Sequence, residues 1–571
     1  MQIISLNGPQ TTGRDYRNLS KPQHGVRRDD NVAIPMRDGA RLLADVHRPD
    51  ADGRYPALIA ASPYPRQIQD LGAPAGFIEA GVTAFWVPRG YVHVIANVRG
   101  TGGSDGTFGF FDAQERRDMH DLVEWAAAQP WCDGNVGMIG ISYFAMTQLE
   151  AAVERPPHLK AIFPVAVTAD LYEGAIHHGL MNASFVTPFL SMIGLASERS
   201  DKLWRSAFVS VVRRILNTPR LHRKFATMNG EAAVTMMRAL LKLPHDPHPW
   251  DELWLDVAVK HPTRDEFWDQ RDVLPMLEAI DIPVYLGCDW ENVPLHLPST
   301  FAAWKALADS PNTRMGMLGQ FGLTWPWESL HTEALAWFDH WLKNRDTGIL
   351  DGPPIRYFLP GAAEWRTADA WPPAGSVHRE LALRADGTVA DDEGAPGGRK
   401  FMVLGAGLNR AKPSRIDPPS TLTWTSAPLD QALDMVGDIE LRLVASATAI
   451  DTAWIVTLLD VAPDGQSEPV TAGWLRASLR EVDEAASRPG APVLPCRNAQ
   501  AVPIGEDVEY RIPLVPNARR FGAGHRLRLV LTGDDQDPST PAIMNFRHAS
   551  VGTSSLNTVA SSSRLLLPVL T

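Results

Sequence analysis

One serine in the chain sits in a context that could make it a nucleophile. Residues 137–144 read GMIGISYF, which predicts a strand, a tight turn at Ser142 and then a helix, the setting of a nucleophile elbow. Gly140 leaves room for the turn, and the backbone N–H of Tyr143 would point at an acyl oxyanion. Phe144 stands where the fuller G-x-S-x-G pattern has glycine, so a serine in an ordinary turn is the alternative.

The elements around Ser142 predict a mostly parallel sheet. Residues 31–49 read as a hairpin with Asp38-Gly39 at its turn, a strong turn signal. Strand-like runs then alternate with helical spacing, which implies crossover connections. The expected strands are 55–62, 91–98, 135–142, 159–167, 282–290 and, as the last of the sheet, 313–321, and the expected helices are 114–131, 144–154 and 331–344.

The alternation of strands and helices changes twice along the chain, and these changes suggest the domain limits. Residues from about 170 to 270 are rich in Met, Trp, Leu and Arg at helical spacing, which indicates a helical insertion over the sheet. After about residue 350, short alternating strands are separated by Gly, Pro and Asp, as in a β-sandwich. The predicted division is a lead-in at 1–28, an α/β core at 29–168 and 276–348, a helical cap at 169–275 and a β-sandwich at 349–571.

Composition excludes several classes of function. The chain has 571 residues, 44% of them hydrophobic, and a net charge of −12, which argues against nucleic acid or an anionic membrane as the main partner. The three cysteines lie far apart, so neither a zinc site nor a disulfide framework is expected. No signal peptide or membrane span is evident. We therefore expect a cytoplasmic protein without metal or cofactor.

Distinctive short motifs are spread along nearly the whole chain after Asn31. They are PMRDG at 35–39, SPY at 62–64, NVRG at 97–100 with Gly102, Ser104, Asp105 and Gly106, GIS at 140–142, and GHRL at 524–527. Together these motifs resemble the CocE/NonD branch of the X-Pro dipeptidyl-peptidase-like hydrolases, a group that includes cocaine esterase and α-amino-acid ester hydrolases. Asn97 replaces the aspartate with which the family begins the third of these motifs.

The resemblance implies a serine hydrolase with an α/β-hydrolase core, a helical cap and a C-terminal jelly roll. It makes Ser142 the nucleophile and forms the oxyanion hole from the Tyr64 hydroxyl and the Tyr143 N–H. A phenol suits that role because its hydrogen bond strengthens as the oxygen gains charge. From the residues alone, the favoured interpretation of Tyr64 is an aromatic that caps the core at a strand end.

The acid and base positions depart from the family pattern. Aligned position for position, Glu291 stands where the family has its aspartate, and Asp289, two residues earlier, is the alternative acid. Leu323 stands where the family has histidine, and leucine cannot accept the serine proton. The base could be His331, the leading candidate, or His296, or the His177-His178 pair in the cap. Ser142 could also act without a histidine.

The main expectation is an enzyme that cleaves a small or medium carboxylic ester or amide through an acyl-Ser142 intermediate, with an apolar part of the substrate under the cap. One alternative is a degenerate hydrolase that kept its pocket for binding. Another is a pocket repurposed for acyl transfer or a non-hydrolytic reaction. X-Pro dipeptide cleavage is a weaker expectation, because it needs an anionic group for the α-ammonium of the peptide, which the sequence does not locate. The expected partner is a small molecule, and self-association is left open.

Overall fold

The structure is a computed structural model, and it describes most of the chain. The described residues are 15–71, 78–196, 202–205, 207–216, 218, 220, 249–307, 310, 312–319, 326–405 and 418–571. Leu323 lies outside them.

The N-terminal part is built on a ten-stranded sheet, in the order β1-β2-β4-β3-β5-β6-β9-β10-β11-β12. The predicted hairpin is confirmed, since β1 and β2 pair antiparallel, and the strands from β4 to β11 in this order run parallel. The bounds are β1 Val26–Pro35, β2 Arg41–Pro49, β3 Tyr55–Ser62, β4 Val92–Asn97, β5 Cys132–Ile141, β6 Leu159–Val165, β9 Val284–Asp289, β10 Thr313–Leu318, β11 Ile355–Leu359 and β12 Glu364–Ala368.

The expectation that the strand at 313–321 ends the sheet is wrong. β11 adds to β10 in parallel, and β12 then pairs antiparallel with β11. Both strands come after the helix that the sequence placed last in the core. Their short alternating pattern resembles that of the strands that follow, so sequence patterning alone did not separate the two sheets.

Helices pack along this sheet where the periodicity predicted them. α3 begins after Asp112, whose carboxylate caps the helix by accepting hydrogen bonds from the N–H groups of Gln114 and Glu115. α4 follows β5 directly. The bounds are α1 Arg66–Gln69, α2 Thr83–Trp86 with a 3₁₀ turn at Val87–Arg89, α3 Ala113–Ala127, α4 Tyr143–Val153, α13 Leu297–Ala306 and α14 Pro326–Lys343.

Between β6 and β9 the chain leaves the sheet and forms the cap. The long cap helix α6 contains Pro188. The bounds are α5 Leu171–Ala175, β7 Ile176–His177, β8 Leu180–Met181, α6 Ala183–Ala196, α7 Lys202–Arg205, α8 Ala207–Leu216, α11 Trp250–Leu255, a π-helix at Asp256–Lys260, α12 Glu266–Asp269 and a 3₁₀ helix at Leu274–Ala279.

Among its described residues, the C-terminal part is all β apart from short 3₁₀ turns at Ala477–Leu479 and Ile543–Asn545. Its eleven-stranded sheet closes on itself, because β23 pairs with both β13 and β17, which joins nine strands into a ring. The bounds are β13 Ser376–Leu383, β14 Thr388–Ala390, β15 Gly398–Val403, β16 Thr421–Ser426, β17 Leu433–Ala447, β18 Ala453–Val461, β19 Ser467–Arg476, β20 Val508–Phe521, β21 Arg526–Thr532, β22 Ser555–Ala560 and β23 Arg564–Leu570.

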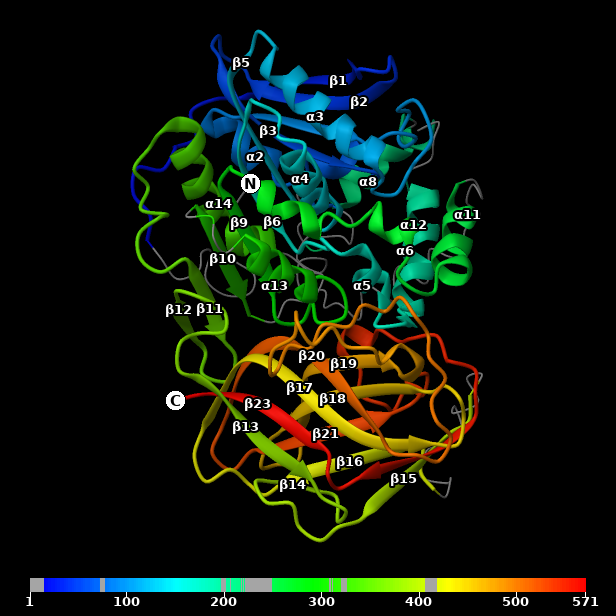
Figure 1. The fold of residues 1–571 in the computed structure, drawn as a ribbon. Helices are drawn as coiled ribbons and strands as arrows, with labels where there is room; N and C mark the ends of the chain where they lie inside the picture. The colour runs from blue at the N-terminus through cyan, green and yellow to red at the C-terminus, as the bar shows by residue number, and fades with distance from the viewer. Residues whose placement is uncertain are drawn as a thin grey trace.

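The two parts meet along α13, α5 and the start of the cap (Figure 1). The cap and the β-domain are also joined by main-chain hydrogen bonds, from Arg476 to the carbonyl of His178 and from Ser184 to that of Arg547. No helix among the described residues is long and apolar enough to cross a membrane.

Candidate active site

The turn between β5 and α4 holds Ser142 in a strained backbone conformation. Its φ of 58° and ψ of −118° are unusual for a residue with a side chain. The Ser142 N–H donates to the carbonyl of Val165 at 2.9 Å, which fixes the turn to β6. A Cβ at Gly140 would lie 2.1 Å from the Cβ of Phe144. Glycine is therefore required at 140, because Phe144 replaces the second glycine of the usual pattern.

Two tyrosines flank the Ser142 hydroxyl. The Tyr64 phenol is 3% exposed and shares a side-chain hydrogen bond with Ser142. Burial holds the pKa of Tyr64 well above its ordinary value, so the phenol keeps its proton. Tyr143 is the first residue of α4, where a backbone N–H has no acceptor within the helix. The structure thus brings together the three residues Ser142, Tyr64 and Tyr143 as predicted.

Asn97 positions Tyr64. Its amide donates to the carbonyls of Tyr64 at 2.7 Å and Ser62 at 3.2 Å, and its oxygen accepts from the buried Arg66 guanidinium at 2.8 Å. An ionised aspartate could not donate to either carbonyl. Asn97 in place of the aspartate therefore has a structural role, which its local sequence does not reveal.

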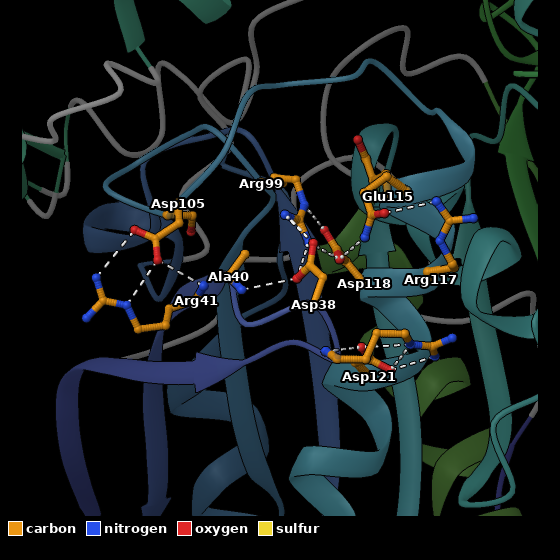
Figure 2. Close-up of polar contacts among 12 residues, drawn as sticks. Asp38, Ala40, Arg41, Arg99, Asp105, Glu115, Arg117, Asp118 and Asp121 are labelled. Carbon is orange, nitrogen blue, oxygen red and sulfur yellow. Dashed lines mark hydrogen bonds and ion pairs between the residues drawn. The ribbon is translucent and has the colours of Figure 1, made fainter.

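Other residues of the same motifs form an outer frame of ion pairs (Figure 2). Arg99 pairs with Asp38 of the opening hairpin and with Asp118 of α3. Arg41 pairs with Asp105 at 3.0 Å. These ion pairs connect the hairpin, the glycine-rich loop after β4 and α3.

The phenol of Tyr143 is anchored away from Ser142. It donates to Glu115 of α3 at 2.7 Å, and its ring stacks on Phe111 with 4.1 Å between centroids. Burial raises the pKa of Glu115 to about 8. The contact fixes the first turn of α4, and with it the direction of the Tyr143 N–H.

Ser142 opens into a small apolar cavity of about 40 Å³ under the cap. Phe185 and Phe189 of α6 contribute to one wall, Phe110 and Phe111 to another. The β-domain supports the cap wall from outside, since Phe546 packs on Phe185 and Leu295. The polar lining residues described are Ser142, Tyr143, Thr168 and His296, and none of the described lining residues carries a carboxylate or an ammonium group.

The two carboxylates considered as the acid lie outside this lining. Asp289, at the end of β9, is fully buried and accepts hydrogen bonds from the Glu291 N–H at 2.9 Å and the Asn292 amide at 2.5 Å. Burial, with the nearby Glu291 charge, holds the pKa of Asp289 well above its ordinary value. Glu291 lines a different cavity, with Glu468 and Ser539 of the β-domain. Neither carboxylate has a hydrogen bond to a histidine among the described residues.

The candidate bases are dispersed. His331 of α14 stacks on Phe85 with 4.5 Å between ring centroids, and burial lowers its pKa to about 3. His177 shares a hydrogen bond of 2.7 Å with His548 of the β-domain, and His178 lies 3.6 Å from Glu173. None of these three is among the described residues that line the Ser142 cavity.

His296 is the histidine that lines the cavity together with Ser142. Its Nδ1 lies 2.8 Å from the hydroxyl of Thr168, and its Nε2 has no hydrogen-bond partner among the described residues. The sequence does not single out Thr168, because nothing in its local sequence marks it. Its place three residues after Val165, the acceptor for the Ser142 N–H, is the signal that could have found it.

Comparison with known proteins bears on this arrangement. A family profile described as X-Pro dipeptidyl-peptidase (S15 family) matches residues 38–322, and one described as the X-Pro dipeptidyl-peptidase C-terminal non-catalytic domain matches residues 347–544. The chain belongs to this family of CocE/NonD and S15 hydrolases. As a member it is a serine hydrolase, of a family that comprises esterases and peptidases.

Individual relatives share the whole architecture. Cocaine esterase of Rhodococcus sp. (strain MB1 Bresler) is 28% identical over 88% of this chain and 90% of its own. A CocE/NonD family hydrolase from Staphylococcus aureus has a TM-score of 0.74 at 22% identity, covering 98% of this chain and 100% of that one. An α-amino acid ester hydrolase has a TM-score of 0.71 at 17% identity, covering 98% of both chains. These structures confirm the predicted fold.

Proposed function

We propose that the chain hydrolyses a carboxylic ester or amide through an acyl-Ser142 intermediate. The observation that carries the proposal is the strained Ser142 turn, with its hydroxyl hydrogen-bonded to Tyr64 at the mouth of an apolar cavity. Strain of this kind persists where the surrounding structure enforces it, and it is concentrated at functional sites.

In the proposed reaction, Ser142 Oγ attacks the acyl carbon and loses its proton to a base. The negative charge that develops on the carbonyl oxygen is stabilised by the Tyr64 hydroxyl and the Tyr143 N–H. The tetrahedral intermediate collapses, the bond to the alcohol or amine breaks, and the leaving group takes up a proton. Water then repeats the sequence on the acyl-serine and releases the acid.

The lining favours a neutral, apolar and short acyl group. A charged acyl group would lose hydration without an ion partner among the described lining residues, which is costly. The same feature disfavours X-Pro dipeptides, whose α-ammonium needs an anionic partner. The volume of about 40 Å³ corresponds to roughly three water molecules, so a long acyl chain has to displace cap side chains.

The test is the intact mass of the protein after treatment with a fluorophosphonate probe. We expect a single adduct on the native chain and none on Ser142→Ala. Ser539→Ala, at a serine of the separate cavity that Glu291 lines, is the matched control and should label like the native chain. A folded native protein that takes up no probe would contradict the proposal and favour a pocket used for binding alone.

A further inference from the structure

We propose that His296 is the general base of the acyl transfer, in place of the histidine that the family has at the position of Leu323. The inference deepens the proposed function and rests on it. It is drawn from the two elements that bring His296 and its neighbour Thr168 to the nucleophile.

The first element is the end of β6. Val165 accepts the Ser142 N–H at 2.9 Å, so the chain that leaves β6 starts beside the nucleophile turn. Three residues later, Thr168 lines the same cavity as Ser142. The hydrogen bond that holds the Ser142 turn therefore also fixes the start of the segment that carries Thr168.

The second element is the turn between β9 and α13, which ends at His296. The Asn292 carbonyl accepts the N–H groups of His296 at 3.1 Å and Leu297 at 2.9 Å. The Asn292 side chain is held in turn by Asp289. The carboxylate at the strand end thus acts on His296 through the backbone, as a positioning residue.

The His296 ring is neutral before reaction. The imidazole is 3% exposed, and burial lowers its pKa to about 3, although the Val167 backbone acts in the opposite direction. In the tautomer that the proposal requires, Nδ1–H donates to the Thr168 hydroxyl and the lone pair is on Nε2, the nitrogen without a partner among the described residues. In this tautomer Nε2 is the atom that can accept a proton in the cavity.

The proton balance is complete with these groups. As Ser142 Oγ bonds to the acyl carbon, its proton passes to His296 Nε2, and the C=O electron pair moves to the oxyanion. When the bond to the leaving group breaks, Nε2–H returns the proton to the departing alkoxide or amine. In deacylation, Nε2 takes a proton from water and returns it to Ser142 Oγ.

The tests use the initial rate of fluorophosphonate labelling and kcat/KM for a short p-nitrophenyl ester. We expect His296→Gln to lower both by at least about 10²-fold, the lower end of what a general base contributes. His331→Gln removes an equally buried histidine outside the cavity lining, and we expect it to stay within about threefold of the native chain, as for groups that do not touch the reacting atoms.

Variants of Thr168 provide a second, independent test of the proposal. Thr168→Val removes the hydroxyl that orients the ring while conserving its shape, and we expect a loss of about tenfold or more in kcat. Thr168→Ser keeps the hydroxyl and should recover most of the native rate, which a purely structural role of the threonine methyl would not produce. Added imidazole should partly restore His296→Ala, because it can enter the vacated space as a free base.

The outcomes separate the two proposals. If the native chain labels at Ser142 but folded His296→Gln labels at the native rate, or Thr168→Val is fully active, the base assignment is overturned and the proposed function stands. If the native chain does not label at all, both fail. Melting temperatures of each variant show whether a lost rate reflects lost folding.

Discussion

The two halves of the candidate site are built in different ways. In the nucleophile half, Ser142 and the Tyr143 N–H are placed by the backbone of one turn, and the Tyr64 backbone is fixed by Asn97. In the acid–base half, the sequence predicts Glu291 and Leu323 at the family's acid and base positions, and Glu291 faces a different cavity. The histidine in the Ser142 cavity reaches it from the start of α13.

This difference shows which parts of a catalytic site are free to change. A strained turn and its oxyanion donors depend on backbone geometry that few sequences satisfy, so their residue types stay recognisable. A base needs an imidazole nitrogen with a lone pair within reach of Oγ, and different loops at the mouth of a site can carry one.

The largest expected effect is in the nucleophile half. Tyr64→Phe removes one oxyanion donor without emptying its place in the core. We expect kcat for a p-nitrophenyl ester to fall by about 10²–10³-fold with little change in KM. Tyr172→Phe, at another buried tyrosine, whose hydroxyl donates to the carbonyl of Pro262 at 3.3 Å, should remain near the native rate. Equal losses in both variants would show a packing effect instead.

The second prediction concerns Glu115, the buried residue that accepts the hydrogen bond of the Tyr143 hydroxyl. The pKa of Glu115 is about 8 in the fold, above its ordinary value, so the unfolded chain releases the proton at lower pH than the native one. Stability from this group is therefore full at low pH and is lost as the pH rises to about 8. Relative to the native chain, Glu115→Gln should gain about 4 kcal/mol between about pH 5 and about pH 9.

Chemical unfolding of both proteins across this pH range measures the difference. Glutamine keeps an acceptor for the Tyr143 hydroxyl, so activity at neutral pH should change little. A constant difference in stability across the range would show that Glu115 does not titrate as its burial implies.

The third prediction tests whether the cavity beside Ser142 binds the acyl group of the substrate. Phe189→Ala enlarges the cavity at the cap wall, and we expect the ratio of kcat/KM for an octanoyl ester to that for an acetyl ester to rise about tenfold, the scale of a few methylene contacts. Phe301→Ala removes an aromatic side chain from the cleft formed by α13 and the β-domain and should leave the ratio unchanged. An unchanged ratio in Phe189→Ala would place the acyl group elsewhere.

Most of the fold could be predicted from the sequence, because alternating strands and helices, the Asp-Gly turn and the GIS elbow are local signals. β11 and β12 were missed as members of the first sheet, since short strands carry no mark of the sheet they join. Ser142, Tyr64 and Tyr143 were predicted to lie together, and they do. His296 and Thr168 lie 128 residues apart, and only the crossover from β6 through the cap to β9 brings them to one cavity.

The smallest expected effect tests the acid of the second half. Glu291 matches the family position in alignment, but it lines a cavity with Glu468, and burial raises its pKa. We expect Glu291→Gln to keep kcat/KM within about threefold of the native chain, as for a residue that does not touch the reacting atoms. Asp289→Asn is the comparison, because it weakens the turn that carries His296 and should lower both stability and rate. A loss of about 10²-fold or more in Glu291→Gln alone would mean that this carboxylate orients the base, and that the acid–base half follows the family more closely than its side-chain contacts indicate.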